Sequence, residues 1–222
     1  MGPSQPSDKG VPDGRRQRGD RARAKILDCS TRIASTEGLE GLTIGRVATE
    51  AGVGKGNIQV LFGDKEALQM ATLEHAVALY KAAVIEPALR QASPLARLVA
   101  LVDGWYAFVE KRTLPGGCFL NATSSEYRAR PGRIHDRVRG YRNGTRARFR
   151  ELIEEAKEAG ELGRDVDASA LSFDLVAHQA AANVAALMGD REEFAFAKRA
   201  SRDRILGAAT AAPRSNTDAT RG

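Results

Sequence analysis

The sequence predicts an all-α protein in which a small three-helix unit precedes a larger helical unit. Apolar residues recur at three- and four-residue spacing through most of the chain, as one buried face of a helix requires. Glycine and proline separate these periodic segments, and no stretch combines alternating polarity with the turn residues of a β-hairpin. No internal repeat is present in the sequence. We therefore expect packed helices joined by short turns.

Residues 1–19 lack this periodicity and are rich in Pro, Gly, Ser, Arg and Asp, a composition typical of a disordered arm. The arm and the residues just beyond it carry the basic side chains of Arg15, Arg16, Arg18, Arg21 and Arg23. These side chains either reach a phosphate backbone or a minor groove, or belong to a solvated tail. The sequence leaves both interpretations open.

The first helix is expected to begin after Asp20 and to end near Glu37, where Gly38 can terminate it. Its buried side is expected to carry Ile26, Ser30, Ile33 and Ala34. This side would cover the two short helices that follow.

Residues 39–68 predict two short helices around a glycine turn. Thr43 can cap the first helix, and Gly52 is free to adopt the positive φ that a tight break demands. A second helix covers about residues 54–61, and Asp64 is the expected cap of the next one. The apolar face of the first helix consists of Ile44, Val47, Ala48 and Ala51. This is the layout of a helix-turn-helix, in which the second helix enters the DNA major groove.

Longer helices follow. The helix after Asp64 is expected to end at Pro87, and Ser93 with Pro94 fits a cap and a first-turn proline for a helix to about Glu110. The expected buried stripe of the first of these helices is Met70, Leu73, Val77, Tyr80 and Val84. A later stripe comprises Ile134, Val138, Tyr141, Thr145, Phe149, Leu152 and Ala156. The helix opened by Asp167 is expected to face inward through Leu171, Leu175, His178, Ala182 and Ala186, and a last helix covers about residues 191–209.

These elements predict four regions. They are a disordered basic arm (1–19), a helix-turn-helix domain (20–66), a larger helical domain (67–212) and a disordered tail (213–222).

Composition limits the classes of protein that fit. A chain of 222 residues with 42% hydrophobic and 28% charged residues suits a soluble globular protein. No apolar run approaches the roughly 20 residues of a membrane span, and the polar N-terminus does not resemble a signal peptide. Cys29 and Cys118 lie far apart, which favours reduced thiols and a cytoplasmic location. The net charge of +6 is compatible with a polyanionic partner.

The stretch from about Arg21 to Glu74 resembles the N-terminal DNA-binding domain of the TetR/AcrR family of transcriptional regulators. The resemblance rests on the order and spacing of Glu37-Gly38, Leu42-Thr43-Ile44, Val47-Ala48, Ala51-Gly52-Val53, Lys55-Gly56, Phe62 and Asp64-Lys65-Glu66-Ala67-Leu68. Trp105, residues 115–119 and residues 160–162 look like one common type of TetR-family C-terminal domain. The resemblance implies a homodimer whose larger domain binds a small molecule and dimerises. Most members of the family are repressors that their ligand releases from DNA.

Two departures from the family pattern concern the operator that is read. The recognition helix reads Ile58-Gln59-Val60-Leu61-Phe62, without the tyrosine that is common there. Ile44-Gly45 stands where a basic or polar residue is common, and Arg46 can compensate.

The predicted DNA-binding residues combine amides, cations and small residues near the start of each short helix. Asn57 and Gln59 suit a bidentate bond to adenine, Lys55 suits guanine or phosphate, and Val60 suits a thymine methyl group. Thr43 and Lys65 lie at helix N-termini, which favour phosphate. The full predicted set is Thr43, Arg46, Lys55, Gly56, Asn57, Gln59, Val60 and Lys65. The alternative is that Thr43 only caps its helix and Lys65 is only a solvated charge.

A ligand pocket and a dimer interface are expected in the larger domain. The candidate pocket residues are Trp105, Phe108, Phe119, Tyr127, Phe173 and His178, each of which is otherwise plain core. Cys118 is either a reactive thiol or, as we favour, a buried structural cysteine. The last two long helices, with small residues such as Ala180-Ala181-Ala182, are the expected homodimer interface.

The segment from Arg128 to Arg150 holds nine arginines against one acid, Asp136, a local balance of +8. Either long arginine stems cover the edges of the apolar stripe, or the segment forms an anionic-ligand site or a DNA-facing patch. The sequence leaves these interpretations open.

No catalytic or metal-binding constellation is recognisable, since His75, His135 and His178 are widely separated and no phosphate loop or nucleophile elbow is present. We therefore predict a cytoplasmic DNA-binding regulator without a cofactor. Its expected partners are an operator duplex, a small-molecule effector and a second copy of the chain. The alternative is a helical dimeric ligand- or protein-binding module without specific DNA binding.

Overall fold

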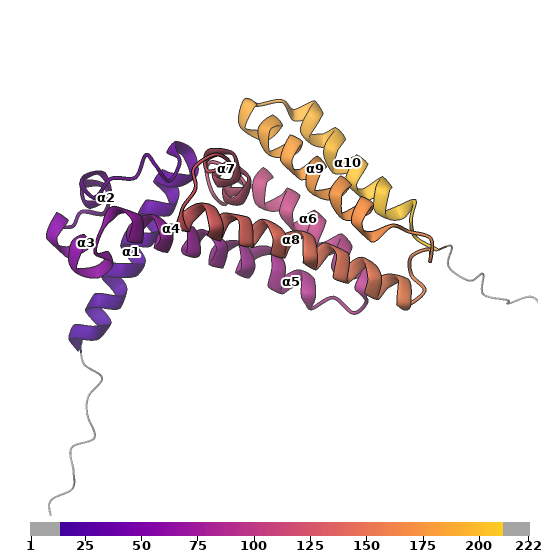
Figure 1. Ribbon diagram of the computed structural model, residues 1–222, viewed down its shortest axis with the longest axis horizontal. Helices are drawn as coiled ribbons and strands as arrows, with labels where there is room; N and C mark the ends of the chain where they lie inside the picture. The colour runs from indigo at the N-terminus through magenta and orange to yellow at the C-terminus, as the bar shows by residue number, and fades with distance from the viewer. Residues whose placement is uncertain (1–13, 211–222) are drawn as a thin grey trace, which may run out of the picture. The chain divides into compact units, whose positions relative to one another are not determined.

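The computed structural model describes residues 14–210, and within them the chain is helical with no strand (Figure 1). One isolated antiparallel bridge joins Leu162 and Ala209. The elements are α1 (Gly14–Glu37), α2 (Ile44–Ala51), α3 (Lys55–Phe62), α4 (Lys65–Tyr80), η1 (Lys81–Ile85), α5 (Glu86–Leu89), α6 (Pro94–Glu110), α7 (Phe119–Glu126), α8 (Arg133–Glu158), α9 (Ala168–Met188) and α10 (Arg191–Leu206). The predicted all-α class is confirmed. None of the helices in the described range has the length and apolar character needed to cross a membrane.

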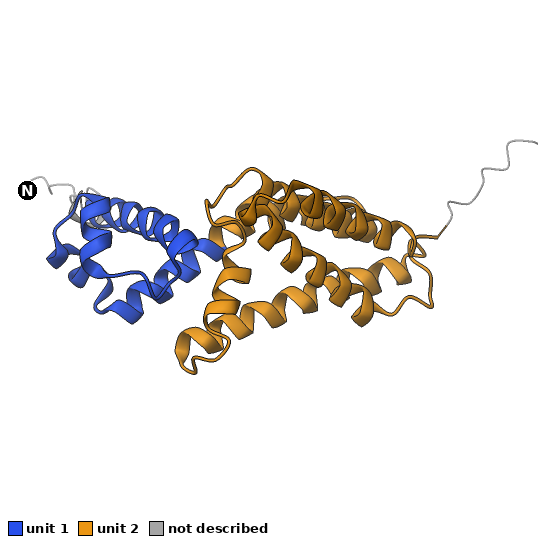
Figure 2. Cartoon of the chain, turned by 90° about the horizontal axis from the view of Figure 1, so that it is seen from above, with its two compact units in different colours: residues 1–77 blue, residues 78–222 orange. Residues whose placement is uncertain are grey.

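The chain divides into two compact units, which we call unit 1 (to Val77) and unit 2 (from Ala78), coloured separately in Figure 2. This division falls within α4, later than the boundary that we expected after residue 66. The physical reason is that the first turns of α4 pack into unit 1. Leu68 and Leu73 are fully buried there, and the Gln69 side chain donates a hydrogen bond to the carbonyl of Leu39 at 2.7 Å.

Helix α1 begins at Gly14, so residues 14–19 are helical and our expectation that the helix starts after Asp20 is wrong. These first turns carry no apolar residue, and apolar periodicity therefore gave no signal there. The rest of the predicted arm and the C-terminal tail lie outside the described residues. The predicted buried side of α1 is confirmed, because Ile26, Ser30, Ile33 and Ala34 are all buried.

Polar side chains join α1 to α4 inside unit 1. The hydroxyls of Ser30 and Thr72 lie 2.8 Å apart, and one donates to the other. The hydroxyl that accepts can donate to a carbonyl of its own helix, that of Leu27 for Ser30 or Leu68 for Thr72. The buried face of α4 is Leu68, Gln69, Thr72, Leu73 and Ala76. Of the expected stripe, Met70, Val77 and Tyr80 are only half-buried. The real face includes two polar residues, which a search for apolar spacing overlooks.

The helical path does not end at Pro87. A π-helical turn, η1, precedes the proline, and α5 carries the path to Leu89. Proline lacks an N–H and its ring clashes with the carbonyl four residues earlier in a regular α-helix. The wider turn just before Pro87 accommodates this without ending the helix.

In unit 2, α6 begins and ends as predicted, with the Ser93 hydroxyl accepting from the Ala96 N–H at 3.2 Å. Gly117, before α7, has φ +72°, and a Cβ there would lie 2.5 Å from Oδ1 of Asn183. That oxygen accepts a 2.7 Å hydrogen bond from the backbone N–H of Cys118. The α6–α7 turn is thereby fixed to α9, and only glycine fits at position 117.

Candidate nucleic-acid interface

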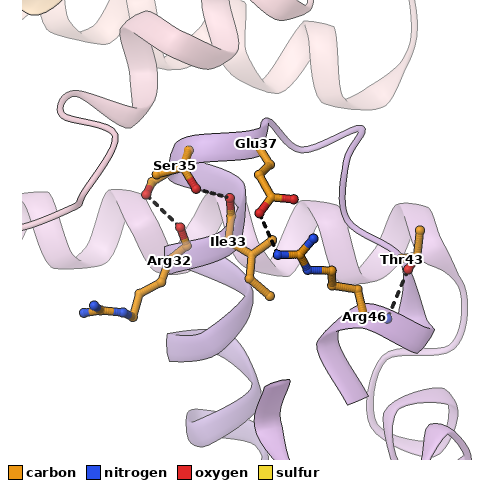
Figure 3. Close-up of polar contacts among 7 residues, drawn as sticks. Arg32, Ile33, Ser35, Glu37, Thr43 and Arg46 are labelled. Atoms are coloured by element: carbon orange, nitrogen blue, oxygen red, sulfur yellow. Dashed lines mark hydrogen bonds and ion pairs between the residues drawn. The ribbon is translucent and has the colours of Figure 1, made fainter. Parts of the chain in front are cut away.

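Helix α2 is fixed by a cap and a glycine turn. Thr43 has extended backbone angles, and its hydroxyl accepts a 3.1 Å hydrogen bond from the Arg46 N–H (Figure 3). Gly52 ends the helix at φ +64°. Val47, Ala48 and Ala51 are buried, whereas Ile44 is half-buried. The predicted cap and turn are confirmed, and α2 is a support that faces the interior of unit 1.

Helix α3 is held through two positions one turn apart. Ile58 is fully buried and Phe62 is 9% exposed. By the 100° step of a helix, Gly56 and Val60 lie on the side opposite Ile58, with Asn57 and Gln59 on its two flanks. All four are exposed, and Val60 is 86% exposed. The face of α3 that points away from unit 1 therefore carries two amides around an exposed valine.

Arg23 of α1 completes the attachment of α3, a role that sequence reasoning missed. Its guanidinium lies 4.4 Å from the centroid of the Phe62 ring and donates to the carbonyl of Leu61 at 2.8 Å. Both contacts stabilise the last turn of α3. The sequence left open whether Arg23 reaches DNA or belongs to a solvated tail, and the structure instead places its guanidinium against α3 within unit 1. An arginine that fits an aromatic residue and a helix C-terminus far along the chain leaves no local pattern.

Arg18 and Arg21 are exposed on α1, so Arg18 lies in a helix and not in the disordered arm that we expected. Contact of either side chain with DNA stays a prediction. The backbone of Arg15 and Arg16 belongs to α1.

Lys55 lies at the start of α3 and reaches back over α2. A Cβ added to Gly45 would lie 3.3 Å from Cε and 3.6 Å from Nζ of Lys55. Gly45 therefore leaves room for the lysine stem beside the first turn of α2. The exposed Lys55 ammonium and the N–H groups that open α2 and α3 give this edge of unit 1 a positive character.

Two predicted DNA contacts have partners within unit 1. Arg46 donates to Oε1 of Glu37 at 2.7 Å, as Figure 3 shows. The Lys65 ammonium donates to the Glu40 carbonyl at 3.0 Å and lies 3.5 Å from the Glu40 carboxylate. The side chains of both pairs are 40–45% exposed. Ion pairs this exposed are worth about 0–1 kcal/mol, so each cation remains accessible to a competing phosphate.

The predicted pocket residues have different environments in unit 2. Trp105, Phe108 and Phe119 are at most 5% exposed and lie in the core of unit 2. Phe173 is 65% exposed on the outer side of α9, and Tyr127 lines a surface groove beside α8. Their role in binding a ligand stays a prediction, since helix periodicity does not tell a core face from a surface face.

His178 belongs to a polar cluster between helices. Its Nδ1 lies 3.2 Å from the Ser201 hydroxyl, which lies 2.9 Å from the Tyr106 hydroxyl. Tyr106 also donates to the carbonyl of Ala197 at 2.9 Å. The cluster ties α6, α9 and α10 together, as expected for a core histidine. Burial also raises the pKa of the Cys118 thiol, which favours the structural interpretation of that cysteine.

The outer surface of α9 and α10 exposes large apolar side chains. Phe173, Val184, Leu187, Met188 and Phe196 are between 45% and 81% exposed. The two helices lie side by side, orange and yellow in Figure 1. Large apolar side chains exposed on two neighbouring helices are typical of a surface that another molecule covers.

Comparisons with known proteins agree for both units. Residues 26–71 match the family described as "Bacterial regulatory proteins, tetR family". Residues 94–201 match the family described as "Tetracyclin repressor-like, C-terminal domain". The first match covers α2 and α3, and the second runs from α6 into α10.

Individual relatives point the same way. The HTH-type transcriptional regulator BetI of Burkholderia thailandensis is 36% identical over 81 residues, which are 36% of this chain and 42% of that protein. The chain thus spans about two fifths of the length of the curated relatives that it matches. A TetR transcriptional regulator from Chloroflexus aurantiacus has the same fold, with a TM-score of 0.78 at 22% identity over 88% of this chain and all of that one.

The structure of AibR in complex with isovaleryl coenzyme A and operator DNA also shares the fold. Its TM-score is 0.60 at 19% identity, over 72% of this chain and 84% of that one. The helix-turn-helix geometry of unit 1 and the matches to both units confirm the resemblance seen in the sequence. The chain belongs to the TetR family of bacterial regulatory proteins.

Proposed function

We propose that this protein is a transcriptional regulator rather than an enzyme. It binds a palindromic operator as a homodimer through α3, and a small-molecule ligand releases it from DNA. The observation that carries this proposal is the outward face of α3. Asn57 and Gln59 flank an 86% exposed Val60 on a helix that is held from behind by Ile58 and Phe62.

The chemistry of that face suits the major groove. Amide side chains can form bidentate hydrogen bonds with adenine, and an apolar side chain packs against a thymine methyl group. Exposed Lys55 adds a cation at the end of α3 that would enter the groove first. Val60 has no packing role in unit 1, because its side chain is almost fully exposed.

Phosphate contacts would flank the recognition helix. Thr43 and Arg46 lie at the start of α2 and Lys65 at the start of α4, where N–H groups favour an anion. Arg46 and Lys65 would exchange exposed carboxylates for phosphates, at the small cost of a surface ion pair.

The apolar surface of α9 and α10 supports the homodimer. A two-fold dimer buries the same patch of both copies and presents two copies of α3 to two half-sites. Phe173 and Phe196 are the largest exposed apolar side chains on these two helices, and they would be the central contacts of the interface.

A structural neighbour supports the binding of both a small molecule and DNA, and release of the operator by the ligand is our own proposal. AibR is described in complex with both isovaleryl coenzyme A and operator DNA. For this chain we propose that unit 1 binds DNA and unit 2 binds a small molecule.

Selection of genomic DNA fragments with the purified full-length protein at physiological salt tests the proposal. We expect one enriched palindrome, whose two half-sites match a two-fold dimer. A variant with Asn57→Ala and Gln59→Ala should lose this enrichment while its circular dichroism spectrum stays unchanged. Binding that depends on salt but not on sequence would contradict the proposal and favour a helical ligand- or protein-binding module.

A further inference from the structure

Unit 2 has a surface groove of about 530 Å³ beside α8, which we call the arginine groove. Its volume is in the range of small-molecule sites. Arg128 and Tyr127, just after α7, form part of its wall, and the serines of the last turn of α7 lie beside them. The opposite wall is one stripe of α8, made of His135, Arg139, Arg142 and Arg146.

The charge of the groove is one-sided. Its lining residues include four arginines and one histidine and no carboxylate. The stripe on α8 has steps of four, three and four residues, which place its side chains on one flank of the helix. Like charges so close repel one another, and such an arrangement costs stability unless an anion neutralises it.

Within residues 14–210, an acid pairs with only two of the cations that line the groove. Asp136 lies 3.3 Å from the Arg139 guanidinium and 3.2 Å from Nδ1 of His135, and Arg128 donates to the Ser125 carbonyl. Arg142 and Arg146 form no ion pair with another side chain in residues 14–210, and both are half-buried. These two guanidiniums, one turn apart, are therefore the part of the groove that an anion would contact.

A second cleft on the same helix serves as a comparison. It has a similar volume, about 550 Å³, but it is lined by Arg150 and Lys157 together with Glu151, Glu154 and Asp167. There the Lys157 ammonium lies 3.0 Å from the Glu154 carboxylate. If the arginine stems merely covered the edges of the apolar stripe, there would be no reason for the lining of one cleft to lack acids while that of the other balances its charges.

We propose that the arginine groove binds a small oxyanion that carries at least two negative charges, on phosphate groups or on clustered carboxylates. Arg142 and Arg146 are its principal ligands, since a guanidinium can offer two parallel N–H donors to such a group. Arg139 and Arg128 add charge at the rim. This site lies in unit 2 and does not depend on whether unit 1 binds an operator.

Isothermal titration of the full-length protein without DNA tests the proposal, with pyrophosphate and citrate as probes at constant ionic strength. We expect saturable binding of at least one probe, and the tighter one identifies the phosphate or the carboxylate class. The double variant Arg142→Gln, Arg146→Gln should weaken that binding at least tenfold. The control Arg150→Gln, Arg164→Gln removes the same charge from exposed positions outside the groove and should change it less than twofold.

Thermal unfolding followed by circular dichroism checks that each variant is folded. If the double variant does not fold, the single variants Arg142→Lys and Arg146→Lys replace it. They keep the charge but lose the planar guanidinium with its two parallel N–H donors, and each should still weaken probe binding. Absence of saturable binding of both probes, or equal losses in the groove and control variants, would overturn the proposal. So would a groove variant that keeps probe binding but shows a shallower salt dependence of duplex binding, since the groove would then be a DNA-facing patch.

Discussion

Helices α2 and α3 have the same length, eight residues each, but their residues serve opposite purposes. Helix α2 has a side-chain cap from Thr43 and three buried residues. Helix α3 has Gly54 as its N-cap residue and therefore no side-chain cap, has a glycine at its second position and buries only two residues. The sequence of α2 optimises stability within unit 1. That of α3 accepts poor helix propensity and an exposed valine, which is typical of a surface selected for binding.

The comparison also separates the two kinds of side chain within α3. Ile58 and Val60 are both β-branched and apolar and lie two residues apart, yet one is fully buried and the other is 86% exposed. If α3 is the reading helix, the first should determine folding and the second binding.

The largest expected effect is that of Ile58→Ala. Removing a fully buried isoleucine side chain costs about 2–5 kcal/mol of unfolding free energy. Urea unfolding followed by far-UV circular dichroism measures this, because the single tryptophan, Trp105, belongs to unit 2 and does not report on α3. The matched variant Val60→Ala should change the same free energy by less than about 0.5 kcal/mol. Equal losses in both variants would mean that α3 packs differently from this structure.

Asn57→Ala should act on binding and not on folding. Loss of a bidentate contact to a base costs about 1–3 kcal/mol of specific binding, whereas the exposed amide contributes little to stability. Fluorescence anisotropy with the selected operator and with a scrambled duplex measures the difference.

Lys55→Ala should weaken binding to both duplexes if the ammonium contacts phosphate, and binding to the operator alone if it contacts guanine. Parental affinity in both variants would remove α3 from the interface.

The fold could be predicted from the sequence wherever local chemistry determines it. Thr43, Gly52 and Ser93 have cap or turn roles that depend on neighbours a few residues away, and these predictions were confirmed. The start of α1 and the path through Pro87 were predicted wrongly. The first turns of α1 contain no apolar residue, and a π-helical turn has no sequence signature that apolar spacing detects.

The candidate site could be predicted only in part, for a related reason. The exposure of Asn57, Gln59 and Val60 follows from their angular positions around the helix relative to buried Ile58, so helical periodicity was sufficient to predict it. The packing of Arg23 on Phe62 and the pairing of Arg46 with Glu37 depend on how separate helices meet. Long cationic side chains have many possible partners, and the tertiary structure rather than the sequence spacing determines which partner each one contacts.

Thr43→Ala tests the support that α2 gives to the reading helix. Losing the capping hydroxyl leaves the Arg46 N–H without its partner and should cost about 1 kcal/mol of unfolding free energy. Thr43→Ser keeps the acceptor and should cost much less in the same urea experiment. If the serine variant nevertheless loses operator affinity, the threonine methyl group contributes to the interface. If alanine is as stable as threonine, the cap does not form in solution.

The smallest and most selective effect is expected for Gly56→Ala. Glycine inside a helix costs about 0.5–1 kcal/mol relative to alanine, and a Cβ at position 56 would meet no atom of the protein within 4 Å. Alanine should therefore stabilise unit 1 slightly. The same Cβ would project from the face opposite Ile58, where the backbone is proposed to approach DNA, and operator affinity should fall several-fold.

Gly140→Ala is the matched control, because Gly140 also lies inside a helix, α8, with no atom of the protein within 4 Å of an added Cβ. It should give a similar small rise in thermal stability with unchanged operator affinity. If alanine raises stability but lowers operator affinity at position 56, and does not lower affinity at position 140, the glycine in α3 is retained for binding a partner rather than for the fold. A Gly56→Ala variant that binds as tightly as the parent would instead leave that glycine without a role at the DNA surface.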